Sequence, residues 1–361
     1  DRSSHIRVLP TLDNGWVVFS LDSLKLYKFN SCGVNEWSKK YLLPKPYVTQ
    51  LEFFIKTQSG GYAILTQILN GAIRVSLLTV LDASGNIIWS KMYGDSFYEH
   101  YSYTLGQDIA GNFIIYGNVS SVPVGSNYNM ICKIDGNGNI IWTKFYSWGG
   151  TWGGAIVTSD NGVLARVGFL FIKTDSTGNV QWTTSFLPFN QNYYAPVEVS
   201  DGYIFNLSDN STNGFCKMDK QGNLLLGGRK TFDYVTPPSL RKKSNGNVVG
   251  VFNKGYPTVI EFDKDLNVVN QSSINYYQPG VTLSGTDICF LNDSTAVLLG
   301  KAIVNFAHYL FFAKMNNQYQ TGCDTVLSVN ITNDTVTQSL ISTTAMSYNM
   351  NAVDKNFIVE S

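Results

Sequence analysis

The chain has 361 residues with 26 basic and 26 acidic side chains, so its formal net charge is zero. This balance argues against a nucleic acid as the main partner, because phosphate binding requires an excess of positive charge, and against a polybasic membrane anchor. No apolar run approaches the roughly 20 residues of a membrane-spanning helix, and the five cysteines, an odd number, argue against a disulfide framework. Charged residues are only 14% of the chain, whereas 21 Tyr, 21 Phe, 7 Trp and 32 Gly indicate an all-β protein.

Two short motifs alternate along the chain. The glycine motif is a glycine-containing turn that runs into a β-rich segment, at residues 12–20, 58–66, 109–117, 159–168, 199–207, 244–252 and 292–300. The tryptophan motif follows it each time, with the pattern Lys-x-Asp-x-x-Gly-Asn-x-x-Trp-x-Lys-x-Tyr. It is clear at residues 28–41, 80–93, 133–146 and 173–186, and weaker at 217–228, 261–272 and 314–323.

Each motif predicts a β-hairpin, because the Asp side chain can cap the turn and Gly supplies a positive φ. Two hairpins give four strands in a unit of roughly 40 to 50 residues, which is the size of a propeller blade. We therefore predict an all-β fold, a seven-bladed β-propeller of four-stranded antiparallel blades with a C-terminal extension. Residues 1–323 form the propeller in this prediction, 324–335 are the candidate for its final strand, and 336–361 are the extension.

One repeat position holds Trp37, Trp89, Trp142 and Trp182, and the fifth and sixth repeats have Leu226 and Asn270 there. A large rigid ring at a fixed place in every blade is typical of packing between blades. We predict that role for the tryptophans, with stacking on a ligand as the alternative.

The two motifs resemble the propeller repeats of many secreted and outer-membrane-associated proteins of Bacteroidota. In those repeats a T-x-D-G-G-Y segment precedes K-x-D-x-x-G-N-x-x-W-x-K-x-Y, and the match here covers about residues 6–322. Such propellers occur among the cargo and accessory proteins of the type IX secretion system, including a translocon plug-like accessory. The resemblance implies an extracytoplasmic protein, either periplasmic and associated with the outer membrane or secreted. A C-terminal Ig-like sorting domain, which is typical of cargo, is not evident here.

Both hairpin turns of a blade are expected on one face of the propeller, and the longer, variable connections on the opposite face, where binding sites are common. These connections are rich in aromatic residues beside Ser, Asn and Gly, as protein recognition surfaces are. A glycan would suit such a surface equally, and the rings could instead seal the central channel or wedge between blades. The predicted partner-binding residues are Tyr47, Phe97, Tyr98, Tyr101, Trp148, Trp152, Tyr193, Tyr194, Tyr234, Tyr276 and Tyr277.

No catalytic motif is present, and the three histidines occupy unrelated repeat positions. A glycan-active hydrolase or lyase stays open as an alternative, since carboxylates far apart in sequence can meet in the fold. The candidates, expected near the variable face, are Asp95, Glu99, Asp108 and Glu198. The turn carboxylates Asp82, Asp135, Asp175 and Asp219 lack the clustering that calcium prefers, so we predict turn capping, no metal site and no cofactor.

Cys132 and Cys216 share a repeat position on an inner part of a strand and are expected to be buried. Cys32 and Cys323 both fall in outer-hairpin turns, of the first and seventh blades, which adjoin in a closed ring. We therefore predict a Cys32–Cys323 disulfide.

The leading functional hypothesis is a non-catalytic propeller that binds a protein partner, such as an outer-membrane secretion component. The second is a secreted cargo protein or adhesin that binds a glycan or a cell surface. The C-terminal tail is expected either to dock on its own propeller or to reach a partner.

Overall fold

The computed structural model describes residues 6–20, 24–42, 53–95, 97–121, 125, 127–147, 153–167, 170–187, 195–208, 213–232, 240–253, 255–274, 281–304, 307–321, 324–325, 331–334, 337–340, 345–348, 351–354 and 358–360. These residues form β-strands and turns, with no helix among them. The strands build seven antiparallel sheets, and the fold is a seven-bladed β-propeller, as the repeats predict.

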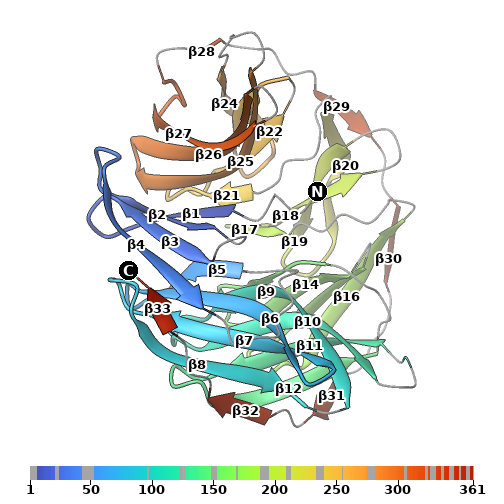
Figure 1. Cartoon of the computed structure of the whole chain (residues 1–361). Coiled ribbons are helices and arrows are strands. Elements are labelled where there is room, and N and C mark those ends of the chain that lie inside the picture. The colour runs from blue at the N-terminus through green and yellow to red at the C-terminus, as the bar shows by residue number, and fades with distance from the viewer. Residues whose placement is uncertain are drawn as a thin grey trace. The chain divides into compact units, whose positions relative to one another are not determined.

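Six sheets each contain four strands that are consecutive in sequence (Figure 1). The first contains β1 (Ile6–Pro10), β2 (Trp16–Ser20), β3 (Lys25–Phe29) and β4 (Asn35–Leu42). The second contains β5 (Phe53–Lys56), β6 (Tyr62–Asn70), β7 (Ile73–Leu81) and β8 (Ile87–Gly94). The third contains β9 (Tyr98–Gln107), β10 (Phe113–Ser121), β11 (Asn127–Ile134) and β12 (Ile140–Tyr146).

The later sheets follow the same order. The fourth contains β13 (Ala155–Val157), β14 (Val163–Val167), β15 (Leu170–Thr174) and β16 (Val180–Leu187). The fifth contains β17 (Val197–Val199), β18 (Gly202–Ser208), β19 (Asn213–Asp219) and β20 (Leu224–Phe232). The sixth contains β21 (Leu240–Lys242), β22 (Val248–Asn253), β23 (Pro257–Phe262) and β24 (Val268–Ile274), and the seventh β25 (Val281–Asn292), β26 (Thr295–Val304) and β27 (Ala307–Asn316).

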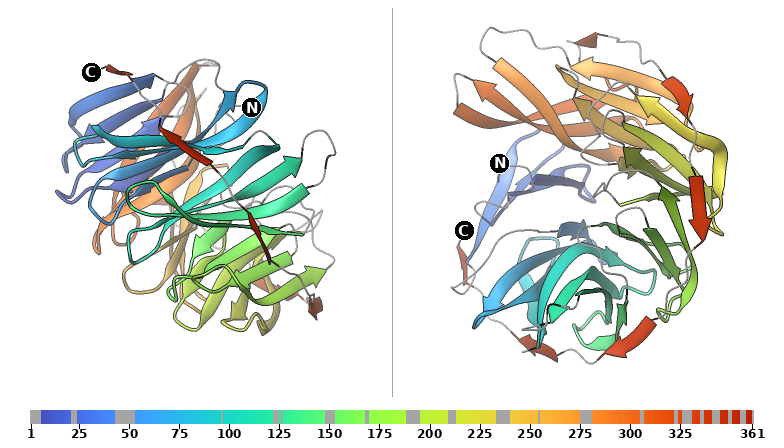
Figure 2. Two further views of the ribbon diagram at one scale, coloured as in Figure 1. Left: turned by 90° about the horizontal axis from the view of Figure 1, so that it is seen from below. Right: turned by 90° about the vertical axis from the view of Figure 1, so that its right-hand side faces the viewer.

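The C-terminal tail adds a fifth strand to the outer edge of six sheets, in reverse order. β28 (Asp324–Thr325) pairs with β24, β29 (Ile331–Asp334) with β20, and β30 (Thr337–Leu340) with β16. β31 (Ala345–Tyr348) pairs with β12, β32 (Asn351–Asp354) with β8, and β33 (Ile358–Glu360) with β4. Both views of Figure 2 show these red strands as short arrows beside the sheets.

The tail therefore docks on its own propeller, one of the two outcomes expected for it. Residues 324–335 were the candidate for a final strand of the seventh sheet, and the structure places them differently. Their two described strands, β28 and β29, pair with the sixth and fifth sheets, and the seventh sheet has three strands in the described part of the chain. The tail passes the outer edges of the other sheets, where unpaired backbone groups are available for hydrogen bonds.

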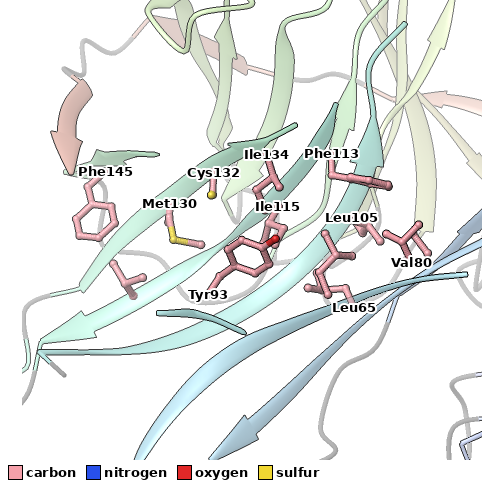
Figure 3. Packing of buried hydrophobic residues seen from close by; sticks show 13 residues of the cluster. Leu65, Val80, Tyr93, Leu105, Phe113, Ile115, Met130, Cys132, Ile134 and Phe145 are labelled. Atoms are coloured by element: carbon pink, nitrogen blue, oxygen red, sulfur yellow. The ribbon is translucent and has the colours of Figure 1, made fainter. Parts of the chain in front are cut away.

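The chain folds into two compact units. One contains Asp1–Val18, Lys28–Glu36 and Phe186–Gln338, and the other contains Phe19–Tyr27, Trp37–Ser185 and Ser339–Ser361. In the second unit, the second and third sheets bury a continuous hydrophobic cluster between their facing sides (Figure 3). In the first unit, a comparable cluster of Val249, Val251, Val259, Ile288 and Leu298 joins the sixth and seventh sheets.

The turn of the tryptophan motif has the predicted capping. In the second sheet the carboxylate of Asp82 accepts hydrogen bonds from the backbone N–H groups of Ser84 and Asn86 and from the Asn86 side chain. Gly85 takes a φ of 76° and donates its N–H to the Asp82 carbonyl. The same bonds recur at Asp135 and Asp175, which confirms turn capping at these positions.

The motif lysine ties the two hairpin turns of a sheet together. Lys133 Nζ lies 2.8 Å from the carboxylate of Asp108, which belongs to the turn between β9 and β10. Lys28–Asp13, Lys173–Asp160 and Lys217–Asp201 form the equivalent pairs in the first, fourth and fifth sheets. Each lysine is largely buried, so the pair offsets the desolvation of its ammonium group.

The remaining motif residues connect neighbouring sheets. The Tyr41 hydroxyl donates to the Gly85 carbonyl at 2.8 Å, and Tyr93 and Tyr146 make the same bond to Gly138 and Gly178. The Trp89 indole N–H donates to the Gly136 carbonyl at 3.0 Å. The tryptophans therefore pack between blades, as the sequence predicts.

Candidate functional site

Of the predicted partner-binding residues, the structure describes Phe97, Tyr98 and Tyr101. They lie together in the connection from β8 to β9 and in the first residues of β9. The other predicted residues are outside the described part of the chain, namely Tyr47, Trp148, Trp152, Tyr193, Tyr194, Tyr234, Tyr276 and Tyr277. The candidate site is therefore the described part of this β8–β9 segment, residues 95 and 97–101.

Phe97 is exposed although its backbone is fixed. Its side chain is 67% exposed, which is unusual for a phenylalanine. The carboxylate of Asp95 accepts hydrogen bonds from the backbone N–H groups of Phe97 and Tyr98, at 2.6 and 2.9 Å. These hydrogen bonds, typical of an Asx turn, fix the backbone at Phe97 while its side chain is exposed.

Tyr98, the next residue, is packed against other aromatic rings. Its ring packs edge-on against Phe145 and Tyr128, with centroids 5.4 and 6.5 Å away. Phe145 and Tyr128 stack on each other at 5.8 Å, next to the hydrophobic cluster of the second and third sheets. Tyr98 therefore contributes mainly to packing, the alternative that the sequence left open for single aromatic residues.

Tyr101 is contacted both at its hydroxyl group and over its ring. Its hydroxyl donates to the Glu99 carboxylate at 2.6 Å, and the Arg74 guanidinium lies over its ring at 4.5 Å. Burial, followed by the hydrogen bond and charge of Glu99, raises the pKa of Tyr101, whereas Arg74 acts in the opposite direction. The phenol is thus neutral at physiological pH and acts as a hydrogen-bond donor to Glu99.

His100 lies beneath the segment and is completely buried. Its Nε2 atom is 3.4 Å from the Asp95 carboxylate. Neither imidazole nitrogen has a hydrogen-bond partner among the described residues. Sequence reasoning did not single out this pair, although the spacing of Asp95 and His100 around an aromatic pair is visible in the sequence.

The candidate carboxylates of a glycan-active enzyme do not form one group. Asp95 and Glu99 belong to the β8–β9 segment, whereas Glu198 is in β17 beside Lys220. Asp108 was expected near the variable face, and this was wrong. It caps the hairpin turn between β9 and β10, at the opposite end of β9 from Glu99. Within the described residues, no three His, Cys, Asp or Glu side chains are arranged to hold a metal ion.

A separate cavity of about 350 Å³ lies between β1, β21 and β25. Arg241 and Asp287 form a salt bridge at 2.8 Å beside it, and Asp287 has no exposed surface. Sequence reasoning missed this cavity, because its residues do not recur in the repeats.

The structure tests the predictions for three of the cysteines. Cys132 and Cys216 are fully buried, as predicted, and burial raises the pKa of the Cys132 thiol to about 12. Cys32 is exposed in the turn after β3. Its predicted disulfide partner, Cys323, lies outside the described residues, so the pairing stays a prediction.

No protein-family model matches the sequence, and no curated protein matches it. Among solved structures, a streptogramin B lyase shares 14% identity with a TM-score of 0.53, over 86% of this chain and 95% of the lyase. A protein of unknown function from Bacteroides caccae shares 11% identity over 89% of this chain and 93% of its own, with a TM-score of 0.40. Prolyl oligopeptidase B from Galerina marginata has a TM-score of 0.48 and 11% identity, over 91% of this chain but only 52% of the peptidase. At such identities the likeness to the lyase shows the fold alone.

In the described part of the chain, no helix has the length and apolar character needed to cross a membrane.

Proposed function

We propose that the protein is a non-catalytic binding propeller and that the β8–β9 segment docks a protein partner. The observation that carries this proposal is Phe97, a largely exposed ring on a backbone fixed by Asp95. A hydrophobic ring on a fixed backbone loses only side-chain conformational entropy when a partner covers it. Such rings are frequent among the few interface residues that dominate binding energy.

The surroundings of Phe97 also suit a protein interface. The adjacent Tyr98 is packed, and a few residues further along β9 Tyr101 contacts both Glu99 and Arg74. An apolar centre with a polar rim is the usual arrangement of protein–protein interfaces.

The resemblance of the repeats supports the class of partner that we propose. Similar repeats occur in extracytoplasmic propellers of Bacteroidota, and on this ground we propose as partner a component of outer-membrane protein secretion, as for a type IX translocon accessory.

The test is a pull-down from detergent-solubilised outer membranes with the wild-type chain and Phe97→Ala. The matched control is Ile88→Ala, since Ile88 lies on β8 and is 59% exposed. We expect one stoichiometric partner to be retained by the wild type and the control, with at least about tenfold weaker binding by Phe97→Ala. Equal binding by all three folded proteins would exclude this segment as the docking site. Turnover of a polysaccharide that disappears in Glu99→Gln would overturn the non-catalytic assignment.

A further inference from the structure

Two of the tryptophans between sheets lie tightly against a glycine in the turn that they face. A Cβ atom added to Gly85 would lie 3.0 Å from the ring of Trp37, and one added to Gly178 would lie 2.9 Å from Trp142. A Cβ contact of 2.9 Å is essentially never seen and one of 3.0 Å is unusually tight, so a larger residue at either turn would force the ring to move. At these two places the tryptophan of one repeat and the glycine of the next form a matched pair.

The sixth and seventh sheets lack both members of this pair. Asn270 occupies the tryptophan position on β24, and Tyr319 occupies the glycine position, with a φ of 58°. The Asn270 amide donates to the Asn317 carbonyl at 3.3 Å, which reproduces the bond from Trp89 to Gly136. The donor is thus retained, but the large ring that fills the space elsewhere is missing.

A groove of about 690 Å³ remains at this place, within the size range of small-molecule sites. Side-chain amides line it, those of Asn245, Asn270, Gln271, Asn317, Gln318 and Gln320. Val269, which is 56% exposed, provides an apolar strip in the wall.

The charged groups of the groove are already neutralised or bonded. Glu261 accepts hydrogen bonds from Lys243 at 2.9 Å and from the Tyr319 hydroxyl at 2.6 Å. Burial alone would raise the pKa of Glu261, but these bonds lower it, so Glu261 is ionised and balances Lys243. Asp293 accepts a hydrogen bond from Ser244. The groove therefore offers mainly amides, and the one charge left without a counter-charge in its lining is that of Asp293.

We propose that this groove binds a neutral polyhydroxylated ligand, that is, an oligosaccharide. A hydroxyl group both donates and accepts hydrogen bonds, and a side-chain amide does the same, so the two match without any charge. The Val269 strip can cover the C–H face of a sugar ring. An anion would find its one nearby lysine already paired, and an apolar ligand would leave the amides desolvated without partners. The site goes beyond the proposed protein-docking role and uses different residues.

The test is calorimetric titration with maltotetraose, cellotetraose, xylotetraose and chitotetraose. The groove is altered in Asn317→Ala/Gln318→Ala, which removes two exposed amides whose side chains have no hydrogen-bond partner in the described structure. The matched control is Asn137→Ala, because Asn137 has the same turn position as Gln318 but lies in the third-sheet turn that Trp89 contacts.

We expect saturable millimolar binding of at least one sugar by the wild type and the control, and at least tenfold weaker binding by the double variant. Absence of saturable binding by the wild type, or equal binding by the double variant, would overturn the proposal. If the double variant does not fold, Asn270→Leu provides a second test. It introduces the residue that the fifth repeat has at this position, and we expect sugar binding to weaken at least tenfold. Phe97→Ala is expected to bind sugar as the wild type does. A negative sugar titration would therefore leave the proposed docking of a protein at Phe97 unaffected.

Discussion

Asp287 is a carboxylate without exposed surface, and its charge is matched by a single arginine. It accepts hydrogen bonds from Arg241 Nε and Nη2 at 3.1 and 2.8 Å, and from the backbone N–H groups of Val8 and Ile288. The attraction to Asp287 raises the pKa of Arg241, and this outweighs the opposing effect of burial. These bonds join β21, β25 and β1, so the pair positions three strands.

Replacing Asp287 with Asn is expected to destabilise the fold by about 3 kcal/mol, because a buried ion pair that loses one partner leaves a charge uncompensated. Asp293→Asn, at an exposed carboxylate in the next turn, is expected to change stability by less than about 0.5 kcal/mol. Urea unfolding of the two variants measures the difference. Similar losses of unfolding free energy in the two variants would show that the charge of Asp287 contributes little to stability.

Asp13 is expected to make stability depend on pH at the acidic end. Partial burial alone would raise its pKa, but hydrogen bonds from Lys28, Thr11 and the Gly15 backbone, together with the Lys28 charge, lower it to about 2. The unfolded chain binds this proton near pH 3.8. The stabilisation is therefore complete above pH 3.8 and is lost as the pH falls towards 2.

The measurement is the unfolding free energy of the wild type and Asp13→Asn between pH 6 and pH 2. We expect the wild type to be the more stable at pH 6 and the difference to shrink as pH 2 is approached. A difference that is constant with pH would contradict this role of Asp13.

The residues that could be predicted are those that recur. Asp82 and Trp89 belong to a motif found several times, so their capping and packing could be inferred from pattern alone. Arg241 and Asp287 occur once, and their contact depends on which strands the fold brings together. The difference between Phe97, which is exposed, and Tyr98, which is packed, depends on the turn at Asp95 and is not visible in composition.

Strands and turns were the best-predicted elements, because each motif encodes a complete hairpin. The sequence also contains the matched loss of tryptophan and glycine at Asn270 and Tyr319. The tight contacts of Trp37 with Gly85 and of Trp142 with Gly178 give a physical reason for the two losses to occur together, and these contacts could be found only from the structure.

Gly178→Ala is expected to be more damaging than Gly246→Ala. Both glycines have a positive φ, 79° and 89°, so alanine is strained at either position, by about 1 kcal/mol. At Gly246 no atom lies within 4 Å of the added Cβ, whereas at Gly178 the Trp142 ring lies 2.9 Å away. Overpacking adds about 1–3 kcal/mol in the second case.

The unfolding free energies of both variants are measured in urea. Because both carry the backbone strain, the difference between them reports the steric clash with the Trp142 ring. The double variant Gly178→Ala/Trp142→Ala is expected to lose less unfolding free energy than the two single variants lose together. Equal losses for the two glycine variants would contradict the matched-pair explanation.

For the whole molecule, the repeat predicted seven sheets but not the path of the tail. The tail strands β28 to β33 are two to four residues long and carry no motif. Their pairing uses backbone groups along sheet edges, and this needs little from the side chains. Sequence pattern therefore identifies β-rich character in residues 324–361 without indicating which edges they join.

Deletion of residues 331–361 is expected to lower the melting temperature and to cause self-association, because five outer strands lose their edge partner. Deletion of 358–361, which removes β33 alone, is the milder control. Sedimentation velocity at several protein concentrations, with thermal melts, checks both effects. A monomeric long deletion with unchanged melting would show that the tail does not protect these edges.

The reverse order of the tail strands has a consequence for how the chain folds. Asp324 pairs with Ile274, 50 residues earlier in the sequence, whereas Glu360 pairs with Lys40, 320 residues earlier. Closing the last of these loops directly would be slow, because loops that join distant residues cost the most entropy. Once β28 is in place, however, each following strand has only a short linker to cross before the next edge. The tail strands are thus expected to pair one after another, from β28 on the sixth sheet to β33 on the first. Unpairing is expected to begin at β33, the strand next to the C-terminus.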